Sequence, residues 1–337
     1  MITLAFFNNK GGVGKTSLAY HLAWMFSNLG LSVVAADLDP QANLTSMFLE
    51  EERLVELWPK DKHPLTIRGA IDPILRGTGD LLPPHVETIE PRIGLVPGDL
   101  GLSVFEDKLS DAWPRCHNRD EAAFRTTTAF YRAVTLAGDS READIVLIDV
   151  GPNLGAINRS ALIASEFVVI PLASDLFSLQ GLRNLGPQLR AWREAWHEIR
   201  AKSPDPDLPL PSGGMEPTGY VVMQHAVRAD RPVKAYLRWM EKIPGEYRES
   251  VLAEDASSPP SANSDSHCLA TLKHYRSLMP LAMEARKPMF SLKPADGAIG
   301  AHVAAVQDCY RDFERLALRI AEECRLPPGR LHVSPTI

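Results

Sequence analysis

The stretch NNKGGVGKTS, residues 8–17, decides the fold. A phosphate-binding loop has the pattern Gly, four residues, then Gly-Lys-Ser/Thr. Gly14, Lys15 and Thr16 close this pattern, but Asn9 occupies the position of its opening glycine. The next residue is a second lysine, Lys10. The stretch therefore predicts a phosphate loop that departs from the usual pattern at two positions.

The segments on either side of the loop have the patterns that such a loop requires. Residues 2–7, ITLAFF, form a continuous apolar run, which is typical of a buried parallel strand. Residues 16–30 carry apolar side chains at helical spacing and end in glycine. Residues 31–39, LSVVAADLD, read as a second buried strand. Strand, loop, helix and strand make one βαβ unit, so the sheet begins parallel and a plain glycine turn is disfavoured.

The alternation of strands and helices continues along the chain. Further strands are expected in residues 92–99, 143–153, 165–173 and 218–224, and helices in residues 65–76, 120–138, 178–200 and about 299–323. This pattern predicts an α/β, doubly wound, mostly parallel sheet with helices on both faces, as in the P-loop NTPase fold. We expect one domain over residues 1–325.

Three segments interrupt this pattern. Residues 203–217 are rich in proline and glycine and predict a surface loop. Residues 254–267 contain few apolar side chains and predict a mobile loop. Residues 326–337 contain three prolines and are expected to form a C-terminal tail.

The charge balance limits the kinds of partner. The chain has 337 residues, is 45% hydrophobic and carries a net charge of −6, which argues against a uniformly basic nucleic-acid-binding surface. Residues 1–217 carry 20 Lys and Arg against 28 Asp and Glu, a net charge of −8. Residues 218–337 carry 16 against 14, a net charge of +2. A surface that binds polyanions is therefore expected in the last third of the chain.

Cysteine usage and hydropathy favour a cytoplasmic protein. The four cysteines form no C-x-x-C pair, and their spacing suggests neither a zinc site nor a disulfide framework. No apolar run approaches the roughly 20 residues of a transmembrane helix. The N-terminal apolar run is too short for a signal peptide.

The residues of the loop indicate how it would bind a nucleotide. Glycines allow backbone N–H groups to close around phosphate oxygens, and the following helix adds its positive N-terminal dipole. Lys15 is expected to reach the β- and γ-phosphates, and the Thr16 hydroxyl to bind Mg²⁺. The expected nucleotide-binding residues are Gly11, Gly12, Val13, Gly14, Lys15, Thr16 and Ser17.

With its lysine before the glycines, KGGVGKTS resembles the deviant Walker A motif of the ParA/MinD family of P-loop ATPases. In that family the extra lysine crosses a dimer interface to the nucleotide of the partner subunit, and Lys10 matches it. The resemblance implies a homodimer that forms on ATP binding. It also implies a cation supplied in trans, comparable to an arginine finger, which contributes roughly 10³–10⁵ in rate in other NTPases.

The resemblance extends to two further segments and covers most of residues 1–320. Residues 36–48, ADLDPQANLTSMF, are similar to the family's switch stretch, which implies that Asp37 orders the Mg²⁺ shell and Asp39 orients the attacking water. Residues 145–155 resemble the Walker B segment, with Asp149 near Mg²⁺, partly through water. Here the family's Pro-Pro-Ser is Gly-Pro-Asn. Taken alone, Asp37 and Asp39 are also compatible with helix caps or turns.

The branches of the family differ in what they bind. MinD-like members carry a C-terminal amphipathic membrane helix, which the proline-containing end of this chain does not resemble, so no membrane partner is expected. Nitrogenase-type reductases need bridging cysteines, which have no counterpart here. ParA-type proteins bind DNA without sequence preference through basic residues of the C-terminal part. The candidates for that role are Arg276, Arg286, Lys287 and Lys293, and an ordinary solvated basic face is the alternative.

The resemblance as a whole implies a ParA-type ATPase that uses ATP and Mg²⁺, with Lys10, Lys15 and Asp39 as its catalytic residues. It would hydrolyse ATP slowly, stimulated by a ParB-like or cargo adaptor protein. The ATP-bound dimer would bind non-specific DNA on the nucleoid and segregate plasmid or chromosomal DNA, or position another cargo. Two alternatives stay open: an ATPase switch that recruits a protein complex without DNA binding, and an anabolic P-loop enzyme.

Overall fold

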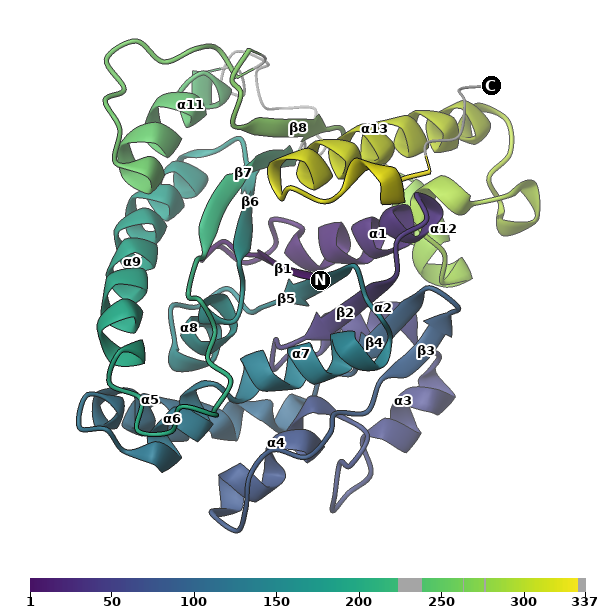
Figure 1. The fold of residues 1–337 in the computed structure, drawn as a ribbon. Coiled ribbons are helices and arrows are strands. Elements are labelled where there is room, and N and C mark those ends of the chain that lie inside the picture. The colour runs from purple at the N-terminus through teal and green to yellow at the C-terminus, as the bar shows by residue number, and fades with distance from the viewer. Residues whose placement is uncertain (224–237, 263, 276, 333–337) are drawn as a thin grey trace.

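An eight-stranded sheet runs through the computed structural model, which describes residues 1–223, 238–262, 264–275 and 277–332 (Figure 1). The strand order is β3-β4-β2-β5-β1-β6-β7-β8. The strands are β1 (Ile2–Phe6), β2 (Val33–Asp37), β3 (Glu87–Glu90), β4 (Ile93–Val96), β5 (Ile145–Asp149), β6 (Phe167–Ala173), β7 (Glu216–Met223) and β8 (Cys268–Leu272). All neighbouring strands are parallel except β3 and β4, which form an antiparallel edge.

Helices pack on both faces of this sheet (Figure 1). The α-helices are α1 (Lys15–Asn28), α2 (Asn43–Phe48), α3 (Glu51–Leu57), α4 (Ile67–Arg76), α5 (Phe105–Cys116), α6 (Glu121–Thr127), α7 (Ala129–Ser140), α8 (Ala156–Ile163), α9 (Leu176–Arg200), α11 (Ile243–Glu246), α12 (Leu278–Ala285) and α13 (Ala301–Glu323). Short 3₁₀ turns are η1 (Leu100–Val104), η3 (Met289–Ser291), η4 (Pro294–Asp296) and η5 (Pro328–Arg330), and η2 (Tyr247–Leu252) is a π-helix.

The alternation of side chains along each strand divides the interior into two cores. Leu4 and Phe6 of β1 belong to a core that includes buried residues of α1 and α13. Ala5 and Phe7 belong to the opposite core, which includes buried residues of α7, α8 and α9. Strands that are buried on both faces read as continuous apolar runs, which is why the sequence revealed them. The predicted doubly wound P-loop fold is confirmed.

Two of the predicted helices differ in detail from the structure. The stretch predicted as one helix over residues 120–138 is two helices, α6 and α7, which meet at Thr128. The Thr128 hydroxyl donates to the carbonyl of Phe124, a local bond that competes with regular helix geometry. The predicted helix at 178–200 begins earlier, at Leu176, because Asp175 caps it by accepting the N–H of Ser178.

Described residues of the segments predicted as loops and tail take part in the sheet or in hydrogen bonds to the rest of the domain. Strand β7 begins at Glu216, inside the predicted loop 203–217, because Glu216 pairs with Phe167 of β6. The end of the predicted mobile loop 254–267 is anchored by the buried carboxylate of Asp265, which accepts hydrogen bonds from Arg248 (2.6 Å) and Tyr220 (2.7 Å). In the tail, the His332 N–H donates to the carbonyl of Leu29 (2.7 Å).

The domain boundary at residue 325 stays a prediction. Among the helices of the described part of the chain, none combines the length and the apolar composition needed to cross a membrane.

Candidate nucleotide-binding site

The register of three central strands brings the predicted site residues to one edge of the sheet. Phe6 at the end of β1 pairs with Asp149 at the end of β5, and Asp37 at the end of β2 pairs with Asp149 from the other side. The loop 8–14 follows β1 directly. The carboxyl ends of parallel strands are where open α/β sheets bind their ligands.

The loop has the backbone geometry of an anion-binding nest. Gly12 (φ 71°) and Gly14 (φ 89°) adopt left-handed conformations that favour glycine. A Cβ added at Gly12 would meet nothing within 4 Å, so the backbone conformation rather than space requires glycine there. Helix α1 begins at Lys15, immediately after Gly14, which directs its positive N-terminal end at the loop.

The ammonium of Lys15 forms only weak hydrogen bonds with the described residues. Lys15 is only 7% exposed, and its Nζ donates to the carbonyls of Asn8 (3.2 Å) and Lys10 (3.3 Å). Burial lowers the pKa of Lys15, while the carboxylates of Asp149 and Asp39 act in the opposite direction. An ammonium with only two long carbonyl contacts is prepared to bind an anion.

Asp37 is fully buried beside the loop and already has hydrogen-bond donors. Its Oδ2 accepts the N–H of Thr45 (2.8 Å) and the Thr45 hydroxyl (2.7 Å). Burial raises the pKa of Asp37 to about 7, against the lowering effect of these two bonds. Asp37 is therefore held in one orientation at the end of β2.

Asp149 is also fully buried, but neither of its carboxylate oxygens has a hydrogen-bond partner among the described residues. Burial, and next the neighbouring carboxylate of Asp37, raise the pKa of Asp149. The nearby Thr16 hydroxyl and the charge of Lys15 lower it, although the Thr16 hydroxyl forms no hydrogen bond of ordinary geometry with either oxygen. A buried carboxylate without donors is costly unless a proton or a cation compensates it.

These residues fit a magnesium ion that is shared with a phosphate. In the part of the chain that the structure describes, no group of three or more His, Cys, Asp or Glu side chains is arranged to hold a metal by itself. Mg²⁺ usually binds through one or two carboxylates, water and the phosphates of a substrate. The unpartnered Asp149 with Asp37 and Thr16 supplies such a partial set of ligands.

Asp39 lies against the segment that was predicted as Walker B. Its Oδ1 accepts the N–H of Gln41 (3.0 Å), and a Cβ added at Gly151 would stand 3.1 Å from the same oxygen. The glycine that departs from the family pattern therefore gives the Asp39 carboxylate room. Asn153, the other departure, shapes the turn before α8, because its Oδ1 accepts the N–H of Gly155 (2.9 Å).

Lys10 lies at the surface, turned toward the start of α9. Its Nζ forms an ion pair with Asp175 and stands 5.8 Å from the ring centre of Phe177. Phe177 is 72% exposed, and Leu176 beside it is 51% exposed. Within a single chain, Lys10 therefore has an acidic partner of its own next to an exposed apolar pair.

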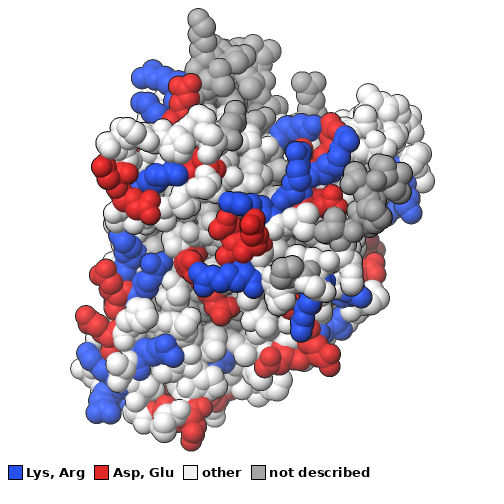
Figure 2. Space-filling view, turned by 45° about the horizontal axis from the view of Figure 1, so that its top comes forward, with Lys and Arg blue, Asp and Glu red and all other residues white. Residues whose placement is uncertain are grey.

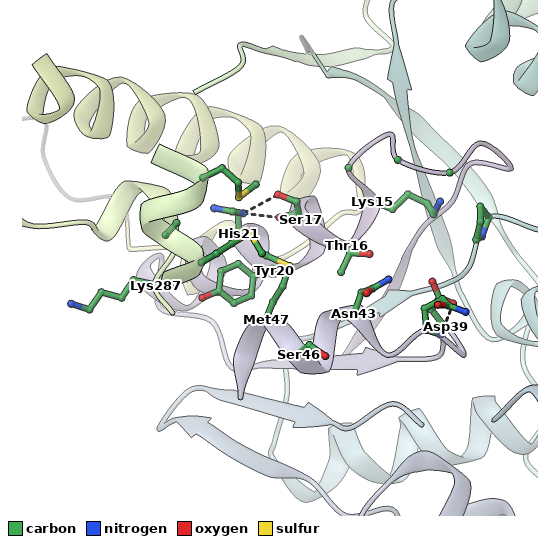
Figure 3. A pocket seen from close by; sticks show the side chains of 18 residues that line it. Lys15, Thr16, Ser17, Tyr20, His21, Asp39, Asn43, Ser46, Met47 and Lys287 are labelled. Carbon is green, nitrogen blue, oxygen red and sulfur yellow. Dashed lines mark hydrogen bonds between the residues drawn. The ribbon is translucent and has the colours of Figure 1, made fainter. Parts of the chain in front are cut away.

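A cavity of about 550 Å³ extends from the loop along α1 (Figure 3). Lys15, Thr16 and Asp39 lie at one end, and Tyr20, Met47 and Lys287 toward the other. The wall also includes Met279, Ala282 and Met283 of α12, so helices far apart in the sequence, α1, α2 and α12, enclose it. Sequence reasoning missed Tyr20 and the methionines, since isolated apolar residues carry no signal of a ligand.

Three of the four predicted DNA-binding residues follow α12, and two of these three are engaged in ion pairs. Arg286 pairs with Glu50 (2.6 Å), and Lys287 pairs with Asp296 (2.7 Å). Lys293 is exposed, and Arg276 lies outside the described residues. Figure 2 shows Lys and Arg interspersed with Asp and Glu over the face that it presents, rather than gathered into one basic field.

Comparisons with known proteins identify the family of this chain. The model of a family described as "AAA domain" (AAA_31) matches residues 1–199. The sporulation initiation inhibitor protein Soj of Bacillus subtilis is 29% identical over 182 residues, which are 54% of this chain and 62% of Soj. The matched part of the chain spans between 41% and 70% of the length of the curated relatives compared.

Solved structures share the fold over nearly the whole chain. Protein DIP2308 of Corynebacterium diphtheriae superposes with a TM-score of 0.69 at 23% identity, covering 98% of this chain and 100% of that one. A plasmid partition protein of Borrelia burgdorferi bound to AMPPNP superposes with a TM-score of 0.60 at 17% identity, covering 95% and 98%. The AAA-domain match covers more than half of the chain and includes the deviant phosphate loop together with Asp37, Asp39 and Asp149. The chain therefore belongs to the ParA/MinD family of P-loop ATPases.

Proposed function

We propose that this protein is a ParA-type ATPase switch that binds ATP with Mg²⁺ at the carboxyl edge of its sheet and dimerises when ATP is bound. The observation that carries the proposal is the convergence of Lys15, which lines the cavity, and the buried Asp149, which has no hydrogen-bond partner among the described residues and lies close enough for its charge to act on Lys15. Each of the two groups lacks a close partner of opposite charge. The Lys15 ammonium suits the negative phosphate, and the Asp149 carboxylate suits the positive Mg²⁺.

Each residue of the edge has a distinct role in this proposal. Lys15 binds the β- and γ-phosphates, while Asp149, Asp37 and Thr16 hold Mg²⁺, partly through water. Bound Mg²⁺ supplies neutralisation of the charge that develops on the phosphate oxygens. Asp39, held by the N–H of Gln41 and 7% exposed, orients the water that attacks the γ-phosphate.

The surface around Lys10 supports dimerisation through this face. Leu176 and Phe177 are exposed directly beside it, and exposed large apolar side chains that lie together favour a protein contact. In the ATP-bound dimer we expect Lys10 to exchange Asp175 for the nucleotide held by a second copy. The slow basal hydrolysis would then depend on a lysine that only the partner can supply.

The proposed cargo is non-specific DNA, which the dimer would bind on the nucleoid and release after an adaptor protein stimulates hydrolysis. The basic balance of residues 218–337 supports this, because two weak patches side by side bind a polyanion much more strongly than one. A switch that recruits a protein complex without DNA is the second candidate. The ion pairs of Arg286 and Lys287 favour that candidate.

Two variants separate assembly from chemistry. Asp39→Ala is expected to bind ATP, dimerise and stall, because only the orientation of water is lost. Lys10→Ala is expected to bind ATP but to dimerise poorly and to lose about 10³–10⁵ in hydrolysis rate. Light scattering after size exclusion with ATP, together with phosphate release, measures both effects.

Lys108→Ala is the matched control, since it removes a lysine of α5 that donates to the Leu75 carbonyl, and it should behave as wild type. If Lys10→Ala dimerises and hydrolyses like the parent, the proposed role of Lys10 is wrong. Retention of the stalled Asp39→Ala dimer on random-sequence duplex DNA decides the cargo. No retention at low salt would favour the protein-recruiting switch, and turnover that requires a small acceptor would indicate an anabolic enzyme.

A further inference from the structure

We infer that Thr45 is a positioning residue for the Mg²⁺ site, because its hydroxyl orients the Asp37 carboxylate and ties it to the turn at Gly98. The inference rests on the proposed function and deepens it. Thr45 is the third residue of α2, is fully buried and does not line the cavity. Because its hydroxyl is already engaged by Asp37 and Gly98, Thr45 would act through Asp37 and not by touching a ligand.

The direction of the Thr45 hydrogen bonds is determined by their partners. The Thr45 Oγ1 lies 2.7 Å from Asp37 Oδ2 and 2.7 Å from the backbone nitrogen of Gly98. The Gly98 N–H can only donate, so it uses a lone pair of the hydroxyl. The single hydroxyl proton is thereby directed at the carboxylate, which also accepts the Thr45 N–H. Asp37 Oδ2 thus has two donors from one residue.

The turn at Gly98, which donates to the Thr45 hydroxyl, also packs against the Asp37 carboxylate. A Cβ added at Gly98 would stand 2.7 Å from Asp37 Cγ, so the backbone of this turn closes one side of the group. The turn is anchored in its own right, because the next residue, Asp99, is buried and accepts hydrogen bonds from Thr66 (2.6 Å) and Gly101 (2.7 Å). Thr45 therefore connects Asp37 to a fixed support.

Asp37 and Asp149 consequently have different roles at one metal site. Asp37 is surrounded by donors, with its Oδ1 accepting the N–H of Asp39 (3.3 Å), whereas Asp149 has no partner among the described residues. A carboxylate with both oxygens engaged is held in place and suits an outer position through water. Asp149, open on both oxygens, suits the inner position.

Thr45 also lies in the first turn of α2, the helix that follows the loop carrying Asp39. That loop ends at Ala42, which adopts a left-handed conformation (φ 50°) and precedes α2. The same hydroxyl therefore joins the strand end that carries Asp37 to the helix that follows Asp39. Removal of a group that orients a metal ligand typically lowers metal affinity by about 10–100-fold.

The test measures metal binding rather than turnover. Thr45→Val keeps the shape and the N–H bond but removes the hydroxyl, and Thr45→Ser restores it. With the full chain and saturating ADP, Mn²⁺ affinity followed by electron paramagnetic resonance should fall about 10–100-fold in Thr45→Val. It should stay within about 3-fold of wild type in Thr45→Ser, since the hydroxyl that orients Asp37 is present.

Tyr220→Phe is the matched control, because it also removes a buried hydroxyl that donates to a buried carboxylate, Asp265, at 2.7 Å. It should lower stability while leaving Mn²⁺ affinity unchanged. ADP affinity in the presence of a chelator should be equal in all variants.

Three results would overturn the inference: a Thr45→Val protein that binds Mn²⁺ as wild type does, a Thr45→Ser protein no better than Thr45→Val, or an equal loss in Tyr220→Phe. If Thr45→Val does not fold, Thr45→Ala replaces it with the same expectation. Failure of the wild type to bind ADP would overturn the proposed function itself, which separates the two outcomes.

Discussion

Charged side chains differ in burial and ion pairing between two regions of the molecule: the carboxyl edge of β1, β2 and β5, and the surface around α12. At the edge, within the described part of the chain, Asp149 is buried without a hydrogen-bond partner and Lys15 has only two long contacts to carbonyls. Around α12, Arg286 and Lys287 are partly exposed and each has a carboxylate within 2.7 Å. The charges of the first set act on one another only at a distance and form no ion pair among the described residues, whereas each charge of the second set has an ion pair.

This difference separates the inner end of the site from its outer part, where Lys287 lines the same cavity, and from the surface around α12. Buried charges without partners are costly, so a ligand that completes them gains strongly. Exposed ion pairs contribute only about 0–1 kcal/mol, so a polyanion can displace them but gains little from any one of them. The effects expected from substitution therefore decrease from the edge to the surface.

The largest effect on ligand binding is expected at Lys15. Lys15→Ala removes two charge-assisted contacts to phosphate, each worth about 1.5–3 kcal/mol, so ATP affinity should fall roughly 10²–10⁴-fold. Isothermal calorimetry with and without Mg²⁺ measures it, and thermal unfolding verifies the fold. An unchanged ATP affinity in Lys15→Ala would show that the edge of the sheet is not a phosphate site, and the difference from the surface around α12 would have no functional meaning.

A smaller effect is expected at His21, which lines the cavity but is already satisfied. Its Nε2 accepts the N–H of Met289 (3.1 Å), so Nδ1 carries the proton and donates to the Ser17 carbonyl (2.7 Å). Burial lowers the pKa of His21 to about 4, although the bond to Ser17 raises it. Below about pH 6.5 the unfolded chain binds this proton first, so folding stability is lost as the pH falls from about 6.5 to about 4.

The measurement is urea unfolding of the wild type and of His21→Gln at several pH values. The stability advantage of the wild type should shrink by about 3 kcal/mol between pH 7 and pH 4. A stability advantage that stays constant over this range would show that His21 is not held neutral. His21 would then not be a cavity residue whose hydrogen bonds are already satisfied.

The smallest effect is expected at the basic residues near α12, where two lysines form a natural pair. Lys293 is exposed and forms no ion pair within the described chain, whereas Lys287 is paired with Asp296. In the stalled Asp39→Ala background, Lys293→Ala should lower the salt slope of DNA binding by about 1, and Lys287→Ala should change it less. Equal slopes in both variants would contradict a difference between free and paired lysines.

The sequence predicted the central strands and the site at their ends because both depend on local patterns. Continuous apolar runs indicated β1, β2 and β5, and parallel pairing then placed Asp37 beside Asp149. Contacts between distant segments left no such pattern. The pairing of Lys10 with Asp175, 165 residues apart, and the bond between Thr45 and Gly98 depend on tertiary packing. The break at Thr128 contains neither glycine nor proline, so periodicity could not reveal it.

The opening residue of the phosphate loop also restricts a helix far along the chain. A Cβ added at Gly181 of α9 would stand 2.9 Å from Asn9 Oδ1 and 3.2 Å from Asn8 Oδ1. A larger residue at position 181 therefore requires the Asn9 side chain, and to a lesser extent that of Asn8, to shift. Across related sequences, positions 9 and 181 are expected to change together, with a smaller residue at one permitting a larger residue at the other. The deviant loop thus has a partner position on α9 that a search with the loop motif alone would miss.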